Sequence, residues 1–174
     1  VVSPDTAGTF SRIAGVLSLH GLDVLSARAH SDEGGTAASQ FRIQLPENGL
    51  NWRAVKADLA RALERQLAIE ARLAEREQTY RRRRRTQAAA PGPPSVVFDD
   101  DASSNATVIV VRASTKVGIL HRISKAISEL GLDIRHATVQ TIGMEVVDTF
   151  YVRANDALVT DPTHRKEIKR ALLH

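Results

Sequence analysis

Apolar residues recur at helical spacing in two stretches of the chain. The first stretch runs from Phe10 to Leu17 and the second from Ile119 to Leu130. Apolar positions three or four residues apart fall on one face of a helix, so both stretches predict amphipathic helices. Gly21 and Gly131 follow them closely, where a helix often ends in a left-handed residue.

Strand-like runs flank each predicted helix. Short runs precede the helices at Val1-Val2 and Thr107–Val111, and longer runs follow at residues 23–31, 36–45, 133–142 and 144–153. Gly34-Gly35 and Gly143 mark tight hairpin turns between the longer runs. A further helix is predicted from about Asn51, and another over Pro162–Leu173, where Asp161 is a favoured N-cap. Each half of the chain therefore predicts the order βαββα.

The two halves also repeat each other in sequence. Residues 8–27 read GTFSRIAGVLSLHGLDVLSA, and residues 118–137 read GILHRISKAISELGLDIRHA. The offset is 110 residues throughout, and eight of these twenty positions are identical. The chain is therefore predicted to contain two copies of one supersecondary unit.

These elements predict an α+β fold of two ferredoxin-like βαββαβ units, with antiparallel sheets and the helices on one face. The first unit is expected at residues 1–100, with a long helical excursion and linker at about 65–94, and the second unit at residues 101–174. Ser95–Phe98 is expected to close the first unit as its last strand. The second unit is expected to lack its last strand, because the sequence reaches His174 before one can form.

The excursion changes its helical register and carries the basic charge of the chain. Its apolar positions are Val55, Leu59, Leu63 and Leu67, followed out of register by Ile69, Leu73 and Tyr80. The shift predicts a kink or a new helix near Gln66. Arg81–Arg85 is typical of a solvated basic run, and residues 87–94 have the composition of a linker.

Composition excludes several classes of protein. The formal net charge is +4, but residues 52–85 carry ten Arg and one Lys against five acids, so the remainder carries −2. There is no Cys, which excludes disulfides and thiolate metal sites. No apolar run reaches the roughly 20 residues of a membrane span, and no signal peptide is visible. The chain starts at Val1 without an initiator Met, so we expect it to be a piece of a longer polypeptide.

The glycine turn before each first helix is the best candidate binding site. Backbone N–H groups at a helix N-terminus can hold a carboxylate, and Gly8 and Gly118 allow close approach because they lack a Cβ. Asp5 can accept hydrogen bonds from an ammonium group, so the first turn suits a free amino acid. The alternative interpretation is structural: Asp5 caps the helix and Gly8 makes the turn.

The two turns are not equivalent. Thr115 stands where the first copy has Asp5, and Lys116 adds a positive charge beside it. The second turn is therefore predicted to be a poorer site for an ammonium group. The first turn is predicted to carry the stronger ligand site.

Three stretches of the chain resemble a known family. They are SPDTAGTFSRIAGVLSLHGLDVLSARAHS, LAEREQTYRRR and VGILHRISKAISELGLDIRHATVQTIGMEVVDTFYV. Together they are similar to the C-terminal tandem ACT domains of bifunctional PII uridylyltransferase/uridylyl-removing enzymes. The most specific part is the ending T-x-G-x-x-x-x-D-x-F-Y-V, which here comprises Thr141, Gly143, Asp148, Phe150, Tyr151 and Val152.

The resemblance implies a sensor and not a catalyst. In that family one domain transfers a nucleotide to the PII signalling protein and an HD-type domain removes it, whereas the ACT pair senses glutamine in the control of nitrogen metabolism. Neither catalytic motif is in this sequence, so Mg²⁺ or Mn²⁺ is expected only for catalytic domains outside it, and no cofactor is expected within it. The resemblance further implies a cytoplasmic protein, contact with PII through the parent enzyme, and association between ACT domains.

The resemblance also implies where the effector lies. In ACT domains it sits at the loop before the first helix, against the second strand of a neighbouring unit. One predicted site therefore combines Asp5, Thr6, Ala7, Gly8, Thr9 and Phe10 with Ile134, Arg135 and His136. The reciprocal site combines Thr115, Lys116, Val117, Gly118, Ile119 and Leu120 with Val24, Leu25 and Ser26.

Other readings of the sequence remain open. An ACT module of another parent, aspartate kinase-like or (p)ppGpp synthetase-like, would bind a different amino acid. An RNA-binding RRM shares the topology, but its first and third strands need aromatic side chains, and Thr107–Val111 has none. No metal site is expected, because the six His show no ligand spacing. Asp99–Asp101 is expected to form a solvated loop, and nothing supports an independent enzyme.

Overall fold

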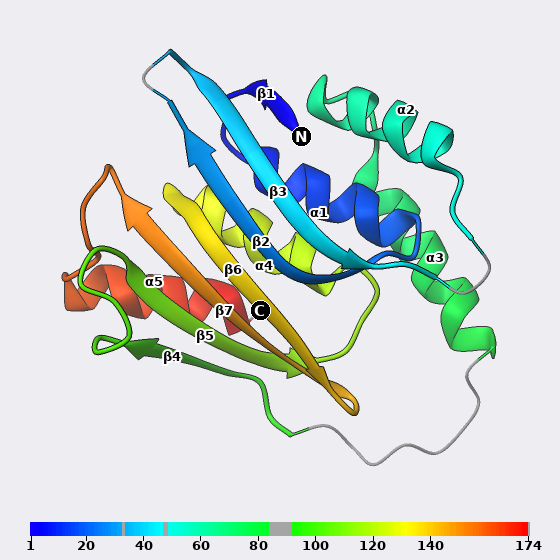
Figure 1. Cartoon of the computed structure of the whole chain (residues 1–174). Coiled ribbons are helices and arrows are strands. Elements are labelled where there is room, and N and C mark those ends of the chain that lie inside the picture. The colour runs from blue at the N-terminus through cyan, green and yellow to red at the C-terminus, as the bar shows by residue number, and fades with distance from the viewer. Residues whose placement is uncertain (33, 47–48, 84–91, 174) are drawn as a thin grey trace.

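One antiparallel sheet carries both repeats, and the helices lie on one side of it (Figure 1). The computed structural model describes residues 1–32, 34–46, 49–83 and 92–173. Within them the sheet has seven strands in the order β1-β3-β2-β6-β7-β5-β4. The predicted α+β class is therefore confirmed, but the two units share a single sheet.

Each repeat supplies five elements in the predicted order. The first repeat comprises β1 (Val2–Pro4), α1 (Thr9–Leu19), β2 (Asp23–Ser31), β3 (Thr36–Gln44) and α2 (Trp52–Leu63). The second comprises β5 (Thr107–Ser114), α4 (Ile119–Glu129), β6 (Leu132–Ile142), β7 (Glu145–Ala154) and α5 (Pro162–Leu173). Between them lie α3 (Ile69–Arg83) and β4 (Ser95–Asp99).

The predicted helix ends are confirmed. Gly21 and Gly131 have φ angles of 70° and 71°, in the left-handed region that glycine adopts without strain. Asp161 caps α5, because its Oδ2 accepts a hydrogen bond of 2.9 Å from the backbone N–H of His164. The break expected near Gln66 is also present between α2 and α3, where Arg65 has a φ of 60°.

The prediction that Ser95–Phe98 closes the first unit is wrong. Ser95–Asp99 pairs antiparallel with β5, from Ser95 opposite Arg112 to Asp99 opposite Val108, and not with β1. The loop between β4 and β5 is short, and consecutive strands joined by a short loop usually pair. The strand thus fills the last-strand position that the second unit was expected to lack. The division of the chain at residue 100 stays a prediction.

The two units join through β2 and β6. Ala27 pairs with Ala137, and these two alanines occupy the same position in the repeat. Both strands have an irregularity just before this pairing, at Leu25 and Arg135, which are also equivalent positions. The second strands of the two units therefore pair with each other within the chain, with approximate two-fold symmetry.

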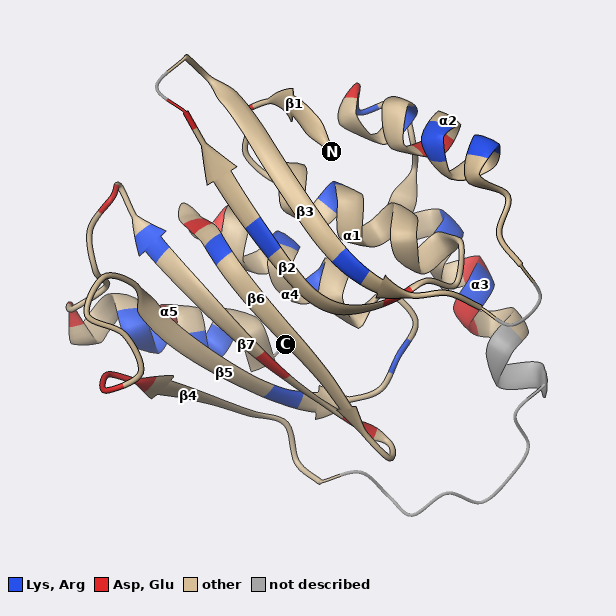
Figure 2. Ribbon diagram, viewed as in Figure 1, with Lys and Arg blue, Asp and Glu red and all other residues tan. Residues whose placement is uncertain are grey.

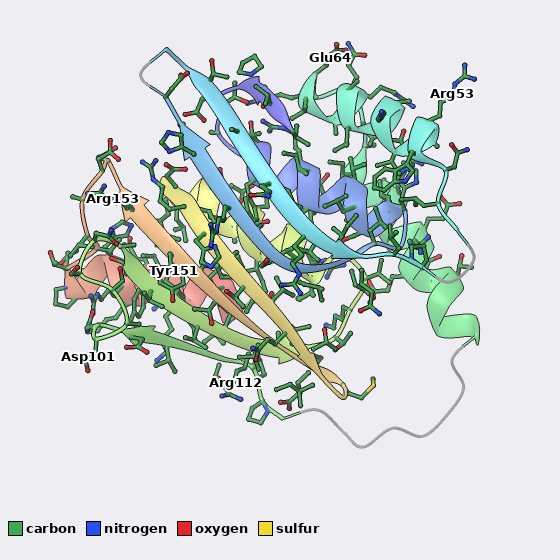
Figure 3. All side chains as sticks on the ribbon, viewed as in Figure 1. Arg53, Glu64, Asp101, Arg112, Tyr151 and Arg153 are labelled. Atoms are coloured by element: carbon green, nitrogen blue, oxygen red, sulfur yellow. The ribbon has the colours of Figure 1, made fainter. Side chains whose placement is uncertain are left out.

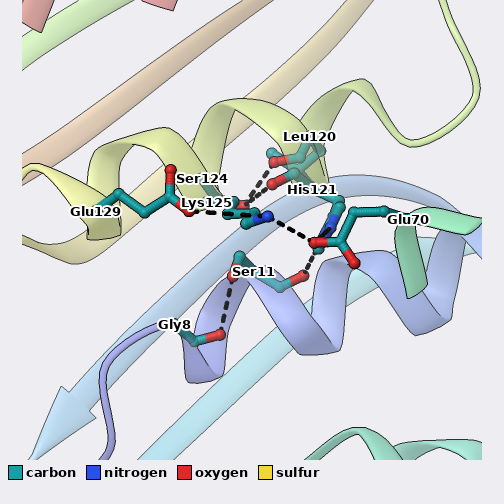
Figure 4. A network of polar contacts seen from close by, with 8 residues as sticks. All are labelled: Gly8, Ser11, Glu70, Leu120, His121, Ser124, Lys125 and Glu129. Carbon is teal, nitrogen blue, oxygen red and sulfur yellow. Dashed lines mark hydrogen bonds and ion pairs between the residues drawn. The ribbon is translucent and has the colours of Figure 1, made fainter. Parts of the chain in front are cut away.

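The first helices of the two units pack against each other beneath this junction. His121 of α4 is buried, and its Nδ1 donates a 2.7 Å hydrogen bond to the backbone carbonyl of Ser11 in α1 (Figure 4). A Cβ at Gly15 would come within 2.8 Å of the same Nδ1 and 2.6 Å of Ile69 Cγ2. The helices can therefore approach this closely only because position 15 has no side chain.

Helix α3 links both units on their helical side. Ile69 and Leu73 are buried with Val16 of α1. Glu70 Oε1 accepts a 2.7 Å hydrogen bond from Lys125 Nζ of α4, which lowers the pKa of Glu70 to about 2 (Figure 4). The excursion is thus partly a packed helix. Residues 84–91 of the predicted basic run and linker, and the side chains of residues 80–83, lie outside what the structure describes.

No helix in the described residues combines the length and the apolar character that a membrane crossing requires.

The side of the sheet that faces away from the helices carries polar residues such as Tyr151 and Arg112, labelled in Figure 3. The opposite side carries the core, in which Phe150, Ile109 and Ile127 are fully buried. The sheet therefore has one solvated face, as alternating antiparallel strands commonly do.

The position of β4 predicts how two neighbouring valines respond to mutation. Val96 is 0% exposed and packs in the core, whereas Val97 is 55% exposed. Val96→Ala should lower the free energy of unfolding by about 2 kcal/mol, and Val97→Ala should change it by less than about 0.5 kcal/mol. Urea unfolding of the two variants measures the difference. Equal effects would show that β4 does not pack as described.

Candidate functional site

Each glycine turn lines a cavity that the two repeats form together. The first cavity, of about 260 Å³, lies between the turn before α1 and the start of β6. The second, of about 530 Å³, lies between the turn before α4 and the start of β2. The two cavities therefore occupy equivalent places on either side of the β2–β6 junction.

The structure brings together most of the residues predicted for these sites. All six turn residues from Asp5 to Phe10 line the first cavity, together with Ile134 of the other repeat. All six from Thr115 to Leu120 line the second cavity, together with Val24. The role of these residues in effector binding stays a prediction, and the geometry assigns each residue to one of the two cavities.

Four of the predicted strand residues do not line either of these cavities. Leu25 and Arg135 lie at the strand irregularities, and Arg135 pairs with Asp133 and Asp156. Ser26 pairs with Thr138 at the junction, and His136 donates from Nδ1 to the carbonyl of Ala27 at 2.8 Å. Ser26 and His136 therefore belong to the contact between units, whereas Arg135 forms ion pairs within its own repeat.

The structural alternative for Asp5 is wrong. The N-cap of α1 is Gly8, with a φ of 80°, and no side chain makes a capping hydrogen bond. The turn is held instead by Thr9 Oγ1, which donates to the carbonyl of Thr6 at 2.8 Å, and by Arg12, which donates to the carbonyl of Ala7 at 3.0 Å. The carboxylate of Asp5 is therefore not used to start the helix.

The first cavity is acidic. Asp5 lines it from the turn and Asp133 from the start of β6. Burial raises the pKa of Asp133, and the nearby carboxylates of Asp5 and Asp156 raise it further, against the opposing effect of Arg135. Two carboxylates at one cavity favour a ligand with a positively charged group.

The second cavity has basic residues at its edge. Lys116 lines it from the turn, and Arg76 and Glu77 line it from α3. The guanidinium of Arg76 lies against the end of α1, since a Cβ at Gly21 would come within 2.7 Å of its Nη2. The sequence predicted a new helix near Gln66, but it held no signal for where that helix packs, so the α3 residues were not predicted to line the cavity.

Asp148 is a buried acid beside the second cavity. It is 0% exposed in β7, and neither carboxylate oxygen has a hydrogen-bond partner among the described residues. Burial raises the pKa of Asp148 to about 7. Within the described part of the chain, no group of three His, Asp or Glu side chains could hold a metal ion, so Asp148 is not part of such a cluster.

Comparisons with known proteins agree with this fold. A family model described as "Plant bHLH transcription factor, ACT-like domain" matches residues 102–174. Over 99% of its length the chain is 36% identical to a bifunctional uridylyltransferase/uridylyl-removing enzyme of Streptomyces coelicolor, and it covers 21% of that protein. It is 35% identical over 99% of its length to the enzyme of the same name from Gluconobacter oxydans, covering 19% of it.

The family model identifies residues 102–174 as an ACT-like domain, and the α+β architecture of the chain is consistent with ferredoxin-like ACT domains. Over 99% of its length the chain is similar to bifunctional uridylyltransferase/uridylyl-removing enzymes, as the sequence resemblance predicted. The chain spans about a fifth of the length of these relatives. It therefore corresponds to one region of such proteins.

The buried acid predicts a pH dependence of stability. The pKa of Asp148 is about 7 in the folded chain, above its unfolded value of 3.8. Its contribution to stability is therefore fully present below pH 3.8 and is lost as the pH rises through 7. Asp148→Asn should gain about 2 kcal/mol of unfolding free energy relative to the wild type between pH 5 and pH 8. Parallel pH profiles in urea unfolding would contradict this prediction.

Proposed function

We propose that the chain is a tandem ACT module that senses a free amino acid, L-glutamine, for a uridylyltransferase/uridylyl-removing enzyme. The observation that carries the proposal is the pair of cavities. Each is lined by all six residues of one glycine turn and by residues of the other repeat. A single repeat could not form either cavity, which accounts for the presence of two copies.

The turns have the chemistry that an amino acid requires. The first helical N–H of each helix is used within the turn, because Thr9 donates to the carbonyl of Thr6 at 3.1 Å and Ile119 donates to that of Lys116 at 3.2 Å. The following N–H groups of the first helical turn have no intrahelical acceptor and are polarised by the helix dipole, so they can bind a carboxylate. Gly8 and Gly118, with φ angles of 80° and 74°, bring the backbone to the cavity without a side chain in between. In the first cavity, Asp5 can accept hydrogen bonds from the ammonium group.

The cavities also suggest how a ligand could act at a distance. Each ligand would contact both repeats, and in the second cavity it would also contact α3. A ligand shifts a conformational equilibrium only when it binds one arrangement more tightly than another. We propose that glutamine stabilises one arrangement of the units, which suppresses nucleotide transfer to PII and permits its removal by metal-dependent catalytic domains elsewhere in a cytoplasmic parent enzyme.

The charge distribution gives less support to nucleic-acid binding. In Figure 2, Lys and Arg are spread over helices and strands and are interspersed with Asp and Glu. A nucleic-acid surface usually gathers basic residues on one face. The described strand β5, Thr107–Ser114, also has no aromatic residue on which a base could stack. We therefore do not advance an RNA-binding function.

Calorimetric titration tests the proposed effector and the predicted inequality of the turns. L-Glutamine should bind the 174-residue chain, and Asp5→Ala should weaken binding by about tenfold or more, because an ionic hydrogen bond is lost. Gly118→Ala should weaken glutamine binding less than Asp5→Ala does, because the first turn is predicted to be the stronger site. The Cβ added at position 118 would lie 2.7 Å from Leu73 Cδ1, so the unfolding temperature of this variant must be measured as well.

Asp101→Ala is the matched control, because Asp101 is an exposed acid that lines neither cavity. Unchanged affinity in Asp5→Ala, or equal losses in both turn variants, would contradict the inequality. The same titration with the other common amino acids tests the effector. Binding of lysine or threonine without glutamine would instead favour an ACT module of another amino-acid-controlled enzyme.

A further inference from the structure

The floor of each cavity is a patch of the sheet made of two neighbouring cross-strand pairs. In the first cavity these pairs are Ala29 with Ser39 and Ser31 with Ala37, on β2 and β3. All four residues line the cavity. In a strand, residues two apart point to the same side, so the four side chains form one surface beneath the turn.

The second cavity has the same floor with one chemical difference. Its pairs are Val139 with Asp148 and Thr141 with Val146, on β6 and β7. Val139, Thr141 and Val146 line the cavity, and Asp148 occupies the remaining corner. Asp148 thus stands where the first cavity has Ser39. Asp148 is completely buried and does not line the cavity itself, but it lies on the same side of the sheet as Val146 and is paired with Val139, both of which do.

The second cavity and its floor carry polar atoms at two separate places that have no hydrogen-bond partner among the described residues. Both carboxylate oxygens of Asp148 lack a hydrogen-bond partner among the described residues, and the side chain is completely buried. Thr115 Oγ1, which lines the same cavity from the turn, is also buried without a partner there. Unpaired buried polar groups are costly in native proteins, so a ligand that pairs with these atoms would offset that cost.

The surrounding charges indicate which kind of ligand fits. The cross-strand partners of Asp148 are the apolar residues Val111 and Val139, which cannot neutralise it. The cavity wall itself carries charges of both signs, with Lys116 and Arg76 as cations and Asp23 and Glu77 as acids. A cavity with cations on its wall and a buried acid beside its floor is complementary to a zwitterion, whose carboxylate and ammonium carry opposite charges.

We propose that Asp148 is a ligand-binding residue of the second cavity and accepts hydrogen bonds from the ammonium group of a bound amino acid. This inference rests on the proposed function. The two cavities then bind the same group from different directions. In the first, the acid is Asp5 on the turn and the floor has Ser39; in the second, the turn has Thr115 and the floor has the acid. The second turn's lack of an acid is thereby compensated by the sheet.

The test compares two ligands that differ only in the ammonium group. L-Glutamine and 4-carbamoylbutanoate, which is glutamine without its amino group, are titrated calorimetrically into the wild-type chain, Asp5→Asn and Asp148→Asn. Asp148→Asn should weaken glutamine binding at one site by about tenfold or more, because a charged acceptor is lost. Its affinity for 4-carbamoylbutanoate should change by less than about twofold, since that ligand has no ammonium group to lose.

Two further variants keep the result interpretable. Asp101→Asn removes a matched exposed acid and should change neither affinity. Asp148→Ser copies the corner of the first cavity and should behave as Asp148→Asn does. Circular dichroism and the unfolding temperature establish that the variants fold. In Asp5→Asn the second cavity is intact and should still bind glutamine about tenfold or more tightly than 4-carbamoylbutanoate. This comparison tests the second cavity without a substitution at Asp148.

Three results would overturn the inference. The first is unchanged glutamine affinity in Asp148→Asn while Asp5→Asn loses affinity, which leaves the proposed function intact. The second is an equal loss for both ligands, or no preference between them in Asp5→Asn, because the ammonium group is then not what Asp148 recognises. The third is that the wild-type chain binds no amino acid, which overturns the proposed function together with the inference.

Discussion

The backbone pairing of β2 with β6 is the constraint on which the rest of the arrangement depends. It places Ala27 opposite Ala137, two equivalent positions of the repeat, and joins two half-sheets into one. The strands then carry α1 and α4 into contact beneath the junction, where Gly15 leaves room for the buried ring of His121. Because the turns precede these helices, each turn faces the other repeat. The shared cavities follow from this one junction.

Helix α3 adds an asymmetric element to this symmetric frame. It packs Leu73 into the helical layer and contacts α4 through Glu70 and Lys125. It also lines the second cavity through Arg76 and Glu77, whereas none of the α3 side chains that the structure describes lines the first. The cavities therefore differ in volume and in charge although their turns occupy equivalent positions in the two repeats. A duplicated unit has in this way acquired two distinct sites.

Local elements could be read from the sequence, but their partners could not. The helical periodicity and the glycine caps located α1, and the bounds of β2 and α5 agree with those predicted. These features depend on residues close in sequence. The partner of β4 depends instead on which distant strand edge is free, and Ser95–Phe98 has no side chain that distinguishes β1 from β5.

The residues of the candidate site also divide into those with a local sequence signal and those whose position depends on tertiary packing. The turns were found because glycine before a helix is a local signal, whereas Arg76 was missed because its position depends on how α3 packs. Asp148 did have a signal in the sequence. It alternates with Val146, Phe150 and Val152, which are all buried, so the period of two places an acid on the inward side of β7. Asp148 was nevertheless not predicted as a site residue.

The location of β4 also has a consequence for dissecting the molecule. The strand that covers β5 precedes it in the chain, so a fragment that begins at Ala102, where the family match starts, would leave that edge of the sheet unpaired. Strand β5 carries Val108, Ile109 and Val111, all buried in the intact chain. An apolar strand with open hydrogen-bonding groups is a template for joining other chains. A soluble excised second unit therefore has to begin before Ser95.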